Sequence, residues 1–336
     1  MFLKRISLKL LLVSLLFFST QFSSAFSDEF NIVYWNVEGA DGDKFYHFKR
    51  MNSLRAMVEE NEMNIDLLIF MENDPISDFS LQAHKFLAKH FKFSEIVPYS
   101  AEYSNVVASV YSREAPSDSI IKSAKITDYP SNKVTQEEID KAMKFYGEAS
   151  NLRPYIRMSY EKLKNRIHIL PLHSIMPWLR IQNRRVDSLK ALPKRLSSLI
   201  GKSEIALRLL YDRNNRHFHQ MKNLLDELAK DQGILEHETV IIVGDHNAPP
   251  RIGPFATALH KLYKLRDFRF VNLRKDSLNH SWPHRDTDFT SSHPKMDLDL
   301  AFVKNGNKNG ITRRVLYTSE GSDHYPIHIN CSDMLF

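Results

Sequence analysis

The sequence predicts a single α/β domain in which strands and helices alternate along almost the whole chain. Three observations support this fold class. Short apolar runs of strand length recur, segments with helical periodicity lie between them, and no internal repeat, low-complexity tract or Gly/Ser-rich linker divides the chain. We therefore expect one domain over residues 26–336, with insertions near residues 128–151 and 174–235.

The expected strands are easy to mark because several are continuous apolar runs, as in strands buried on both faces. Helical spacing of apolar residues predicts the helices that separate them. The strands cover Ile32–Trp35, Leu67–Met71, Val106–Tyr111, Ile156–Tyr160, Ile167–Leu172, Val240–Val243, Leu300–Val303 and Ile327–Ile329. The helices cover Phe48–Asn61, Gln136–Tyr146 and Phe218–Lys230, with a basic helical stretch from Leu179 to Ile200 interrupted by Pro193.

Residues 1–25 read as a secretory leader that is not part of the domain. Basic residues precede an apolar run from Leu10 to Phe18, and Ser23-Ser24-Ala25 forms a small-x-small cleavage pattern. The run is shorter than the roughly 20 apolar residues that a membrane-spanning helix needs. We expect a secreted or periplasmic protein that is cleaved near Ala25, with a retained signal-anchor as the alternative.

Charge and cysteine content narrow the class of protein. The chain has a formal net charge of +6, and removing the leader with its three basic residues leaves +3. This excess allows a phosphate-bearing partner without requiring one. Cys331 is the only cysteine, so no disulfide can form within the chain. The sequence contains no Gly-rich phosphate loop and no G-x-S-x-G elbow, which argues against P-loop and α/β-hydrolase chemistry.

Polar side chains follow the first two predicted strands. Asn36 and Glu38 are two positions apart, so in an extended chain they point to the same side. Glu72 ends an apolar run, where a carboxylate is costly to bury unless it is paired or bound to a metal. Each pattern also fits a strand that ends in a polar turn. Amide and carboxylate oxygens suit a divalent cation, so these residues are candidate ligands.

Two further clusters supply groups for proton transfer and phosphate binding. His173 leaves an apolar strand, where an imidazole can serve a phosphate oxygen, although a lone histidine there is more commonly structural. Asp245 and Asn247 follow another such strand, and Gly244 lets the backbone approach closely. Asp245 can orient or deprotonate water, while the Asn247 amide can bind a phosphate or its transition state. An Asx-turn is the simpler alternative.

The C-terminal cluster is the most informative. Asp323 and His324 stand side by side just before the last strand, and Asp297 and Asp299 lie on one face of another strand. Two acids on a mostly apolar strand need a partner, and a carboxylate fixes the tautomer of a histidine. His324 is a natural partner for either aspartate, and the spacing does not choose between Asp297 and Asp299.

The clusters together form an oxygen-rich donor set with two histidines. No Cys/His spacing typical of zinc sites occurs, so the set favours Mg²⁺, with Mn²⁺ or Ca²⁺ as alternatives. A hard metal ion, a water molecule and histidine together indicate hydrolysis of a phosphoester.

In type and order, these clusters resemble the motifs of the endonuclease/exonuclease/phosphatase superfamily, which includes deoxyribonuclease I, apurinic-site endonucleases, bacterial sphingomyelinases and inositol-polyphosphate phosphatases. The resemblance covers nearly the whole of residues 26–336. It implies a four-layer α/β sandwich in which two mixed β-sheets pack face to face between helices. The motifs that carry it are Trp35-Asn36-Val37-Glu38-Gly39, Glu72, Leu172-His173-Ser174, Gly244-Asp245-His246-Asn247, Asp299-Leu300-Ala301-Phe302-Val303 and Ser322-Asp323-His324-Tyr325-Pro326.

The resemblance also implies a role for each candidate residue. Glu72 would be the main metal ligand, and His324, oriented by Asp299, would act at the phosphate as base or electrostatic stabiliser. Which group is the general base stays open. The remaining roles would be further metal ligands (Asn36, Glu38 and Asp323), water activation (Asp245), phosphate binding (Asn247 and Arg153) and action on the leaving-group side (His173).

Two positions depart from the family pattern. Leu300 stands where the family more commonly has an aromatic residue or histidine, and His246 replaces the commoner Phe or Leu. His173 is nearer to deoxyribonuclease I and the sphingomyelinases than to the apurinic-site enzymes.

Nucleic acid is the leading substrate expectation, because basic residues could line a groove for a phosphate backbone. A solvated helix face is the simpler interpretation of the same charges. The basic residues are Arg180, Arg184, Arg185, Lys190, Lys194 and Arg195, followed later in the chain by Arg266, Arg269, Arg274 and Lys275.

A lipid phosphodiesterase or phosphatase of the sphingomyelinase or inositol-phosphate type is the alternative. For it, Trp178 with Ile175, Met176 and Leu179 would form an apolar tip at a membrane lipid headgroup, although core burial fits these residues equally well. A catalytically inactive binding protein on the same fold is the third possibility. No obligate protein partner is indicated.

Overall fold

A computed structural model of the chain places two β-sheets and the elements that cover them. The described residues are 29–37, 44–60, 64–98, 107–125, 152–162, 165–173, 222, 224–226, 228, 230, 234–246, 261–278, 281, 297–307, 310–316, 322 and 324–332. Within these ranges no helix has the length and apolarity that crossing a membrane requires.

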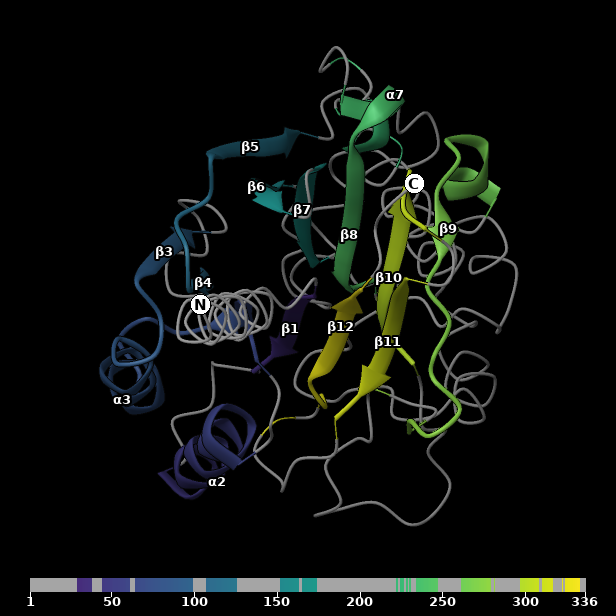
Figure 1. The fold of residues 1–336 in the computed structure, drawn as a ribbon. Coiled ribbons are helices and arrows are strands. Elements are labelled where there is room, and N and C mark those ends of the chain that lie inside the picture. Colours follow the sequence, from purple (N-terminus) through teal and green to yellow (C-terminus); the bar gives the residue numbers. More distant parts are fainter. Residues whose placement is uncertain are drawn as a thin grey trace, which may run out of the picture.

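Each sheet has six strands and mixes parallel with antiparallel pairs (Figure 1). Sheet A has the order β11-β12-β1-β2-β4-β3, and sheet B has the order β5-β6-β7-β8-β10-β9. The parallel pairs are β1–β2 and β7–β8. Sheet A comprises β1 (Phe30–Asn36), β2 (Leu67–Asn73), β3 (Phe93–Pro98), β4 (Val107–Ser112), β11 (Ile311–Val315) and β12 (Ile327–Cys331). Sheet B comprises β5 (Asp118–Lys125), β6 (Leu152–Lys162), β7 (Asn165–His173), β8 (Thr239–Asp245), β9 (Arg269–Phe270) and β10 (Asp299–Lys304).

The two sheets pack face to face through every second residue of their strands. Ile32 and Tyr34 of β1 share one buried cluster with Met158 and Tyr160 of β6. The rings of Phe30 and Tyr160 lie 5.2 Å apart between the sheets. Because side chains alternate across a strand, the other residues of each strand are left to face outward.

Helices cover the outward faces of both sheets. On sheet A, Val33 and Phe70 pack under α2 (Lys44–Arg55), which continues into a π-helical turn (Ala56–Glu60), and under α3 (Asp78–Leu87). The side chain of Ser77 caps the start of α3 by accepting a hydrogen bond from the Ser80 amide. On sheet B, outward apolar side chains of β7, β8 and β10 pack against Leu224, Leu225, Leu228, Leu262 and Tyr263, and α7 (Ile234–His237) precedes β8. The predicted four-layer sandwich is therefore confirmed.

Most predicted elements are present with small shifts at their ends. All eight predicted strands occur, although Val106 lies outside the described residues. The first helix begins at Lys44 and its π-helical extension ends at Glu60. Four strands were not predicted: β3, β5, β9 and β11. The predicted helices over Gln136–Tyr146 and Leu179–Ile200 lie outside the described residues, as does most of the two expected insertions, and the described part of Phe218–Lys230 is helical.

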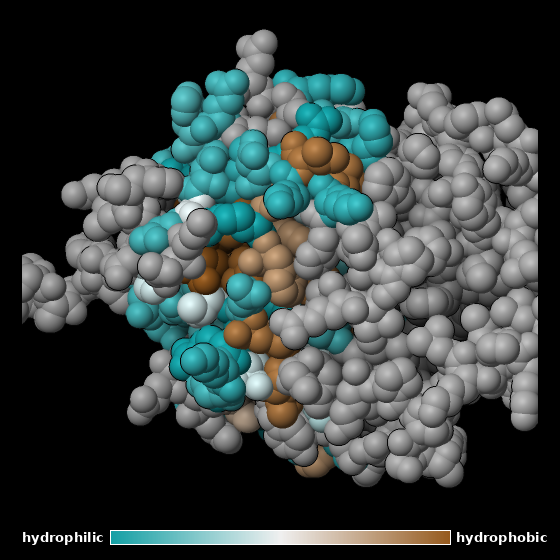
Figure 2. Space-filling view, turned by 90° about the vertical axis from the view of Figure 1, so that its right-hand side faces the viewer, coloured by the Kyte–Doolittle hydropathy of each residue, from teal (hydrophilic) through white to brown (hydrophobic). Residues whose placement is uncertain are grey.

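Few large apolar side chains reach the surface of the described part. On the face that Figure 2 shows, hydrophilic residues border a smaller apolar band. The exposed large apolar side chains are Phe48, Ile76, Leu81, Ile96 and Leu265.

Burial holds two histidines of the strands, His328 of β12 and His168 of β7, in their neutral form. Burial and the nearby charges of Arg314 and Arg274 lower the pKa of His328 to about 4, and His328 Nε2 lies 2.9 Å from Asn31 Oδ1. Burial also lowers the pKa of His168. Because these pKa values fall below the ordinary 6.5, the unfolded chain binds more protons. The contribution of these two neutral histidines to the free energy of unfolding is therefore fully present above pH 6.5 and is lost as the pH falls toward about 4.

Replacing His328 with glutamine should remove part of this acid sensitivity, because glutamine can still donate to Asn31 but does not titrate. Between about pH 7.5 and about pH 5, the free energy of unfolding of the wild type should fall by on the order of 2 kcal/mol more than that of His328→Gln. Urea denaturation at the two pH values measures the difference. The control is His237→Gln, at a side chain that is 84% exposed. Equal pH dependence of the wild type and His328→Gln would contradict the assignment.

Candidate functional site

The predicted polar residues of sheet B fall in one row at the ends of its central strands. In the parallel pair β7–β8, His173 stands opposite Asp245. In the antiparallel pair β8–β10, Asp245 stands opposite Asp299. Residues that face each other across neighbouring strands point to the same side of a sheet, so this register alone gathers a histidine and two carboxylates. All three side chains are buried.

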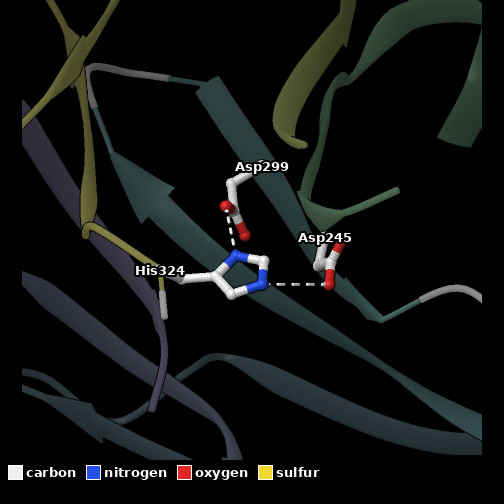
Figure 3. Close-up of side chains that lie close together, drawn as sticks. All are labelled: Asp245, Asp299 and His324. Carbon is white, nitrogen blue, oxygen red and sulfur yellow. Dashed lines mark hydrogen bonds and ion pairs between the residues drawn. The ribbon is translucent and has the colours of Figure 1, made fainter. Parts of the chain in front are cut away.

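His324 approaches this row from sheet A, in the segment just before β12. Its Nδ1 lies 2.7 Å from Asp299 Oδ2, and its Nε2 lies 3.8 Å from Asp245 Oδ2. Figure 3 shows the imidazole ring between the two carboxylates. A carboxylate that accepts the Nδ1 proton fixes the ring and its tautomer, and it leaves Nε2 directed toward Asp245.

Asp297 pairs with an arginine instead of His324, which answers the question of which aspartate orients the histidine. Its carboxylate accepts two hydrogen bonds from the guanidinium of Arg313, at 2.9 Å and 2.5 Å. Asp299 is thus the aspartate hydrogen-bonded to His324, while Asp297 is bonded to Arg313.

A second histidine lies on the other side of Asp245. His173 Nε2 is 2.9 Å from Glu72 Oε1 and 3.6 Å from Asp245 Oδ2. The amide nitrogen of Asn36 lies 3.4 Å from the same Asp245 oxygen. One buried carboxylate oxygen is thus approached by two imidazoles and one amide, from three different strand ends.

Tyr34 holds the ends of β7 and β8 at the spacing that the site needs. Its hydroxyl donates to the carbonyl of Leu172 at 3.1 Å and accepts from the amide of Asp245 at 3.0 Å. Gly244 makes this approach possible, because a Cβ there would lie 1.8 Å from the Leu172 carbonyl oxygen and the φ of Gly244 is +153°. A core tyrosine from sheet A therefore sets the distance between two strands of sheet B.

Glu72 reaches His173 from a backbone conformation that few side chains adopt. Its φ is 55°, in the left-handed region, and the β2–β4 register shifts between Phe70 and Asn73. The amide of Asn73 is bonded to Ser109 Oγ at 2.8 Å and to Ser80 Oγ at 2.7 Å. These buried bonds hold the irregular strand end and keep Glu72 directed at the site.

The segment that carries His324 is tied to β1. The indole of Trp35 donates to the His324 carbonyl at 3.0 Å. Ser322 Oγ donates to the Asn36 carbonyl at 2.7 Å and accepts from the His324 amide at 3.1 Å. The first and last motifs of the chain are thereby packed against each other.

The structure brings together six of the predicted residues: Asn36, Glu72, His173, Asp245, Asp299 and His324. Glu38, Asn247 and Asp323 lie outside the described residues, as does the side chain of Arg153, whose backbone is part of β6. Trp178 and the basic residues between positions 180 and 195 also lie outside the described residues. Tyr34, Asn73, Ser281 and Arg313 support the site but were not predicted from the sequence.

Three arginines of the predicted groove make contacts within the chain. Arg266 pairs with Asp226, Arg269 donates to the carbonyl of Gly306, and Arg274 makes two hydrogen bonds to Asp276. His246, which departs from the family pattern, bonds the Gly244 carbonyl and the Tyr263 hydroxyl in the core beneath sheet B.

The donor set fits a divalent cation. Asp245, Asp299 and His324 each offer a ligand atom, and these atoms lie within 4.8 Å of one another. Glu72 contacts His173, which also lies near Asp245, and Asn36 donates its amide N–H to Asp245. Each of these two side chains also has an oxygen that can serve as a metal ligand. Asp299 Oδ1 is buried without a hydrogen-bond partner, and three carboxylates lie close together in a largely buried space. Such an excess of negative charge favours a hard cation with oxygen ligands.

No model of a known protein family matches the sequence, and no curated protein matches it. Solved structures match over almost the full chain. A variant of beta toxin from Staphylococcus aureus with bound magnesium ions has a TM-score of 0.58 and 15% identity, over 91% of this chain and 100% of that one. Sphingomyelinase C from Streptomyces griseocarneus has a TM-score of 0.56 and 12% identity, over 90% and 99% of the two chains.

The third comparison is with D. rerio TDP2 complexed with a single-strand DNA product. It has a TM-score of 0.54 and 12% identity, over 90% of this chain and 99% of that one. Further matches include endonuclease/exonuclease/phosphatase family proteins from Bacteroides thetaiotaomicron and Leptotrichia buccalis. At these identities the likeness establishes the fold alone, which is deoxyribonuclease I-like.

Gly244→Ala should separate β7 from β8, because the new Cβ would meet the backbone oxygen of Leu172, which cannot rotate away. We expect a loss of about 3 kcal/mol or more in the free energy of unfolding, the upper end for overpacking. Chemical denaturation measures it. Gly306→Ala is the matched control, because a Cβ there meets side-chain atoms of Ile311 and Val303 that can shift. Equal losses in the two variants would contradict the special role of Gly244.

Proposed function

We propose that this protein is a divalent-metal-dependent hydrolase of phosphodiesters, with nucleic acid as its leading substrate. The observation that carries the proposal is the approach of two histidines, His173 and His324, to one buried carboxylate, Asp245. The deoxyribonuclease I-like fold supports the reaction class, because TDP2 in complex with a DNA product and sphingomyelinase C have it too.

Each described side chain has a role that its contacts allow. Asp245 orients the attacking water from its place between the two histidines and accepts the proton that the water loses. His324, held through Nδ1 by Asp299, directs Nε2 at the phosphate and stabilises charge that develops on its oxygens. As the new bond from water oxygen to phosphorus forms and the bond to the leaving oxygen breaks, His173 gives that oxygen a proton, and the contact with Glu72 holds its ring.

Among the described residues, Glu72 and Asn36 would hold the metal ion next to Asp245, whose carboxylate offers a further ligand oxygen. Glu38 and Asp323 are the further ligands expected from the sequence. Bound there, the ion would supply positive charge to the phosphate oxygens.

Nucleic acid leads as the substrate because the chain carries an excess of basic residues. The described arginines of the predicted groove have partners within the chain, so the stretch between residues 180 and 195 would provide most of the groove.

A lipid phosphodiester is the second candidate, and one observation favours it. Ile76 follows Glu72 in the turn before α3 and is 74% exposed, as an apolar contact beside a lipid headgroup would be.

Two assays with added Mg²⁺ distinguish the two candidate substrates. One measures cleavage of supercoiled plasmid, and the other measures release of headgroup from sphingomyelin vesicles. We expect plasmid cleavage, with a rate that falls steeply between about 50 and about 200 mM salt. A plasmid cleavage rate that does not change with salt would count against nucleic acid, and turnover of vesicles alone would assign the lipid substrate instead. Binding to either substrate without any turnover would indicate a binding protein. Export and cleavage near Ala25 are part of the same proposal, and N-terminal sequencing of the exported protein checks them.

His324→Ala should lower kcat by about 10²- to 10⁴-fold, the range for loss of an acid–base or electrostatic group. Steady-state kinetics at saturating Mg²⁺ measure it. His328→Gln is the matched control, since it changes a histidine four residues further along the same segment that contacts Asn31 instead. Retention of the wild-type kcat in His324→Ala would contradict the role of this histidine.

Glu72→Gln should raise the Mg²⁺ concentration needed for half-maximal activity by about tenfold or more, because the carboxylate charge is lost while the shape is kept. Titration with Mg²⁺, and with Mn²⁺ followed by electron paramagnetic resonance, measures the change. Asp74→Asn is the control, since Asp74 accepts a hydrogen bond from the Ile76 amide in the neighbouring turn. An unchanged metal requirement in Glu72→Gln would remove Glu72 from the metal site.

A further inference from the structure

We propose that Arg313 is a positioning residue that fixes the Asp299–His324 pair by clamping the start of β10. This inference rests on the proposed function, since the pair it positions is the one assigned to act on phosphate. Arg313 belongs to β11 of sheet A, and it is fully buried. The residues that it clamps lie just before and at the start of β10, which belongs to the other sheet.

The guanidinium makes three hydrogen bonds to one short segment. Nη1 and Nη2 bind the two carboxylate oxygens of Asp297, at 2.9 Å and 2.5 Å, and Nη1 also donates to the carbonyl of Asp299. The planar fork thus fixes a side chain and a backbone group two residues apart. The guanidinium carbon lies over the ring of Phe270, 5.2 Å from the ring centre, which adds a cation–π attraction.

Ser281 completes the clamp from the amide side. Its Oγ accepts hydrogen bonds from the amides of Leu298 and Asp299, at 3.0 Å and 2.9 Å. Its own carbonyl accepts from the amide of Tyr325 at 2.6 Å. The amide and carbonyl of Asp299 are therefore both held, and the residue after His324 is tied to the same point. Catalytic geometry is sensitive to such control, because a displacement of about 1 Å can cost about 10²-fold in rate.

Stability alone gives little reason for an arginine at this position. Ile311, Arg313 and Val315 share one face of β11, and the two neighbours of Arg313 are buried apolar residues. Moving two charges out of water is costly, and apolar replacements of a buried ion pair are commonly neutral or stabilising. What an apolar residue cannot supply is the hydrogen bond to the Asp299 carbonyl. The structure therefore favours a positioning role.

The test replaces the whole ion pair, so that no buried charge is left without a partner. In Asp297→Leu/Arg313→Met we expect a folded protein in which kcat falls by about 10- to 100-fold while KM changes by less than about twofold. The low-field proton resonance of His324 Nδ1–H should broaden or disappear, because the imidazole is no longer held against Asp299. Arg314→Met, at the exposed neighbour on β11, is the matched control and should leave both readouts unchanged.

If the double variant does not fold, the variant Arg313→Lys provides the test of the positioning role. Lysine keeps the charge but lacks the fork, so kcat and the resonance should both be diminished relative to Arg314→Met. A folded double variant, or a folded Arg313→Lys, with wild-type kcat and an intact resonance would overturn the proposal. If the wild type hydrolyses no phosphodiester, the proposed function fails, and the resonance alone still decides the positioning role, with loss supporting it and persistence refuting it.

Discussion

The hydrogen bond between His324 and Asp299 is the contact on which the arrangement of the site depends. It joins the end of sheet A to the end of sheet B, across 25 residues of sequence. The two sheets must therefore meet at a fixed separation and with fixed register. That separation is set by the apolar layer between them, and it is fixed locally by Tyr34, whose hydroxyl reaches from β1 to both β7 and β8.

The second constraint is electrostatic. Glu72, Asp245 and Asp299 are gathered at one edge, where two of the three carboxylates are almost wholly buried. Burying like charges is unfavourable unless each has a partner. His173 and His324 are partners for part of this buried negative charge, and a divalent cation would balance the rest. The left-handed backbone of Glu72 indicates that the fold accepts local strain to hold this group in place.

Much of the fold and the centre of the site could be predicted from the sequence, because each functional residue follows a strongly apolar strand. The choice between Asp297 and Asp299 could not be made, since it depends on Arg313, a partner on another strand. The sequence does contain one indication that Arg313 is buried. Side chains alternate between the two faces of a strand, and Arg313 falls on the same face as the apolar residues Ile311 and Val315. Tyr34 reads only as a core residue, and nothing in the sequence indicates that its hydroxyl bridges two other strands. Ser281 lies in no recognisable motif.

Substrate choice depends on surfaces around the site, while the chemistry depends on the site itself. The central claim concerns the chemistry: the meeting point of the strand ends binds a divalent cation for phosphoester hydrolysis. An anomalous difference map from crystals soaked in Mn²⁺ tests it most directly. The account predicts a strong peak beside the Glu72 carboxylate and the Asn36 side chain, between the two sheets. A protein that binds Mn²⁺ only elsewhere, with no peak at this edge, would contradict it.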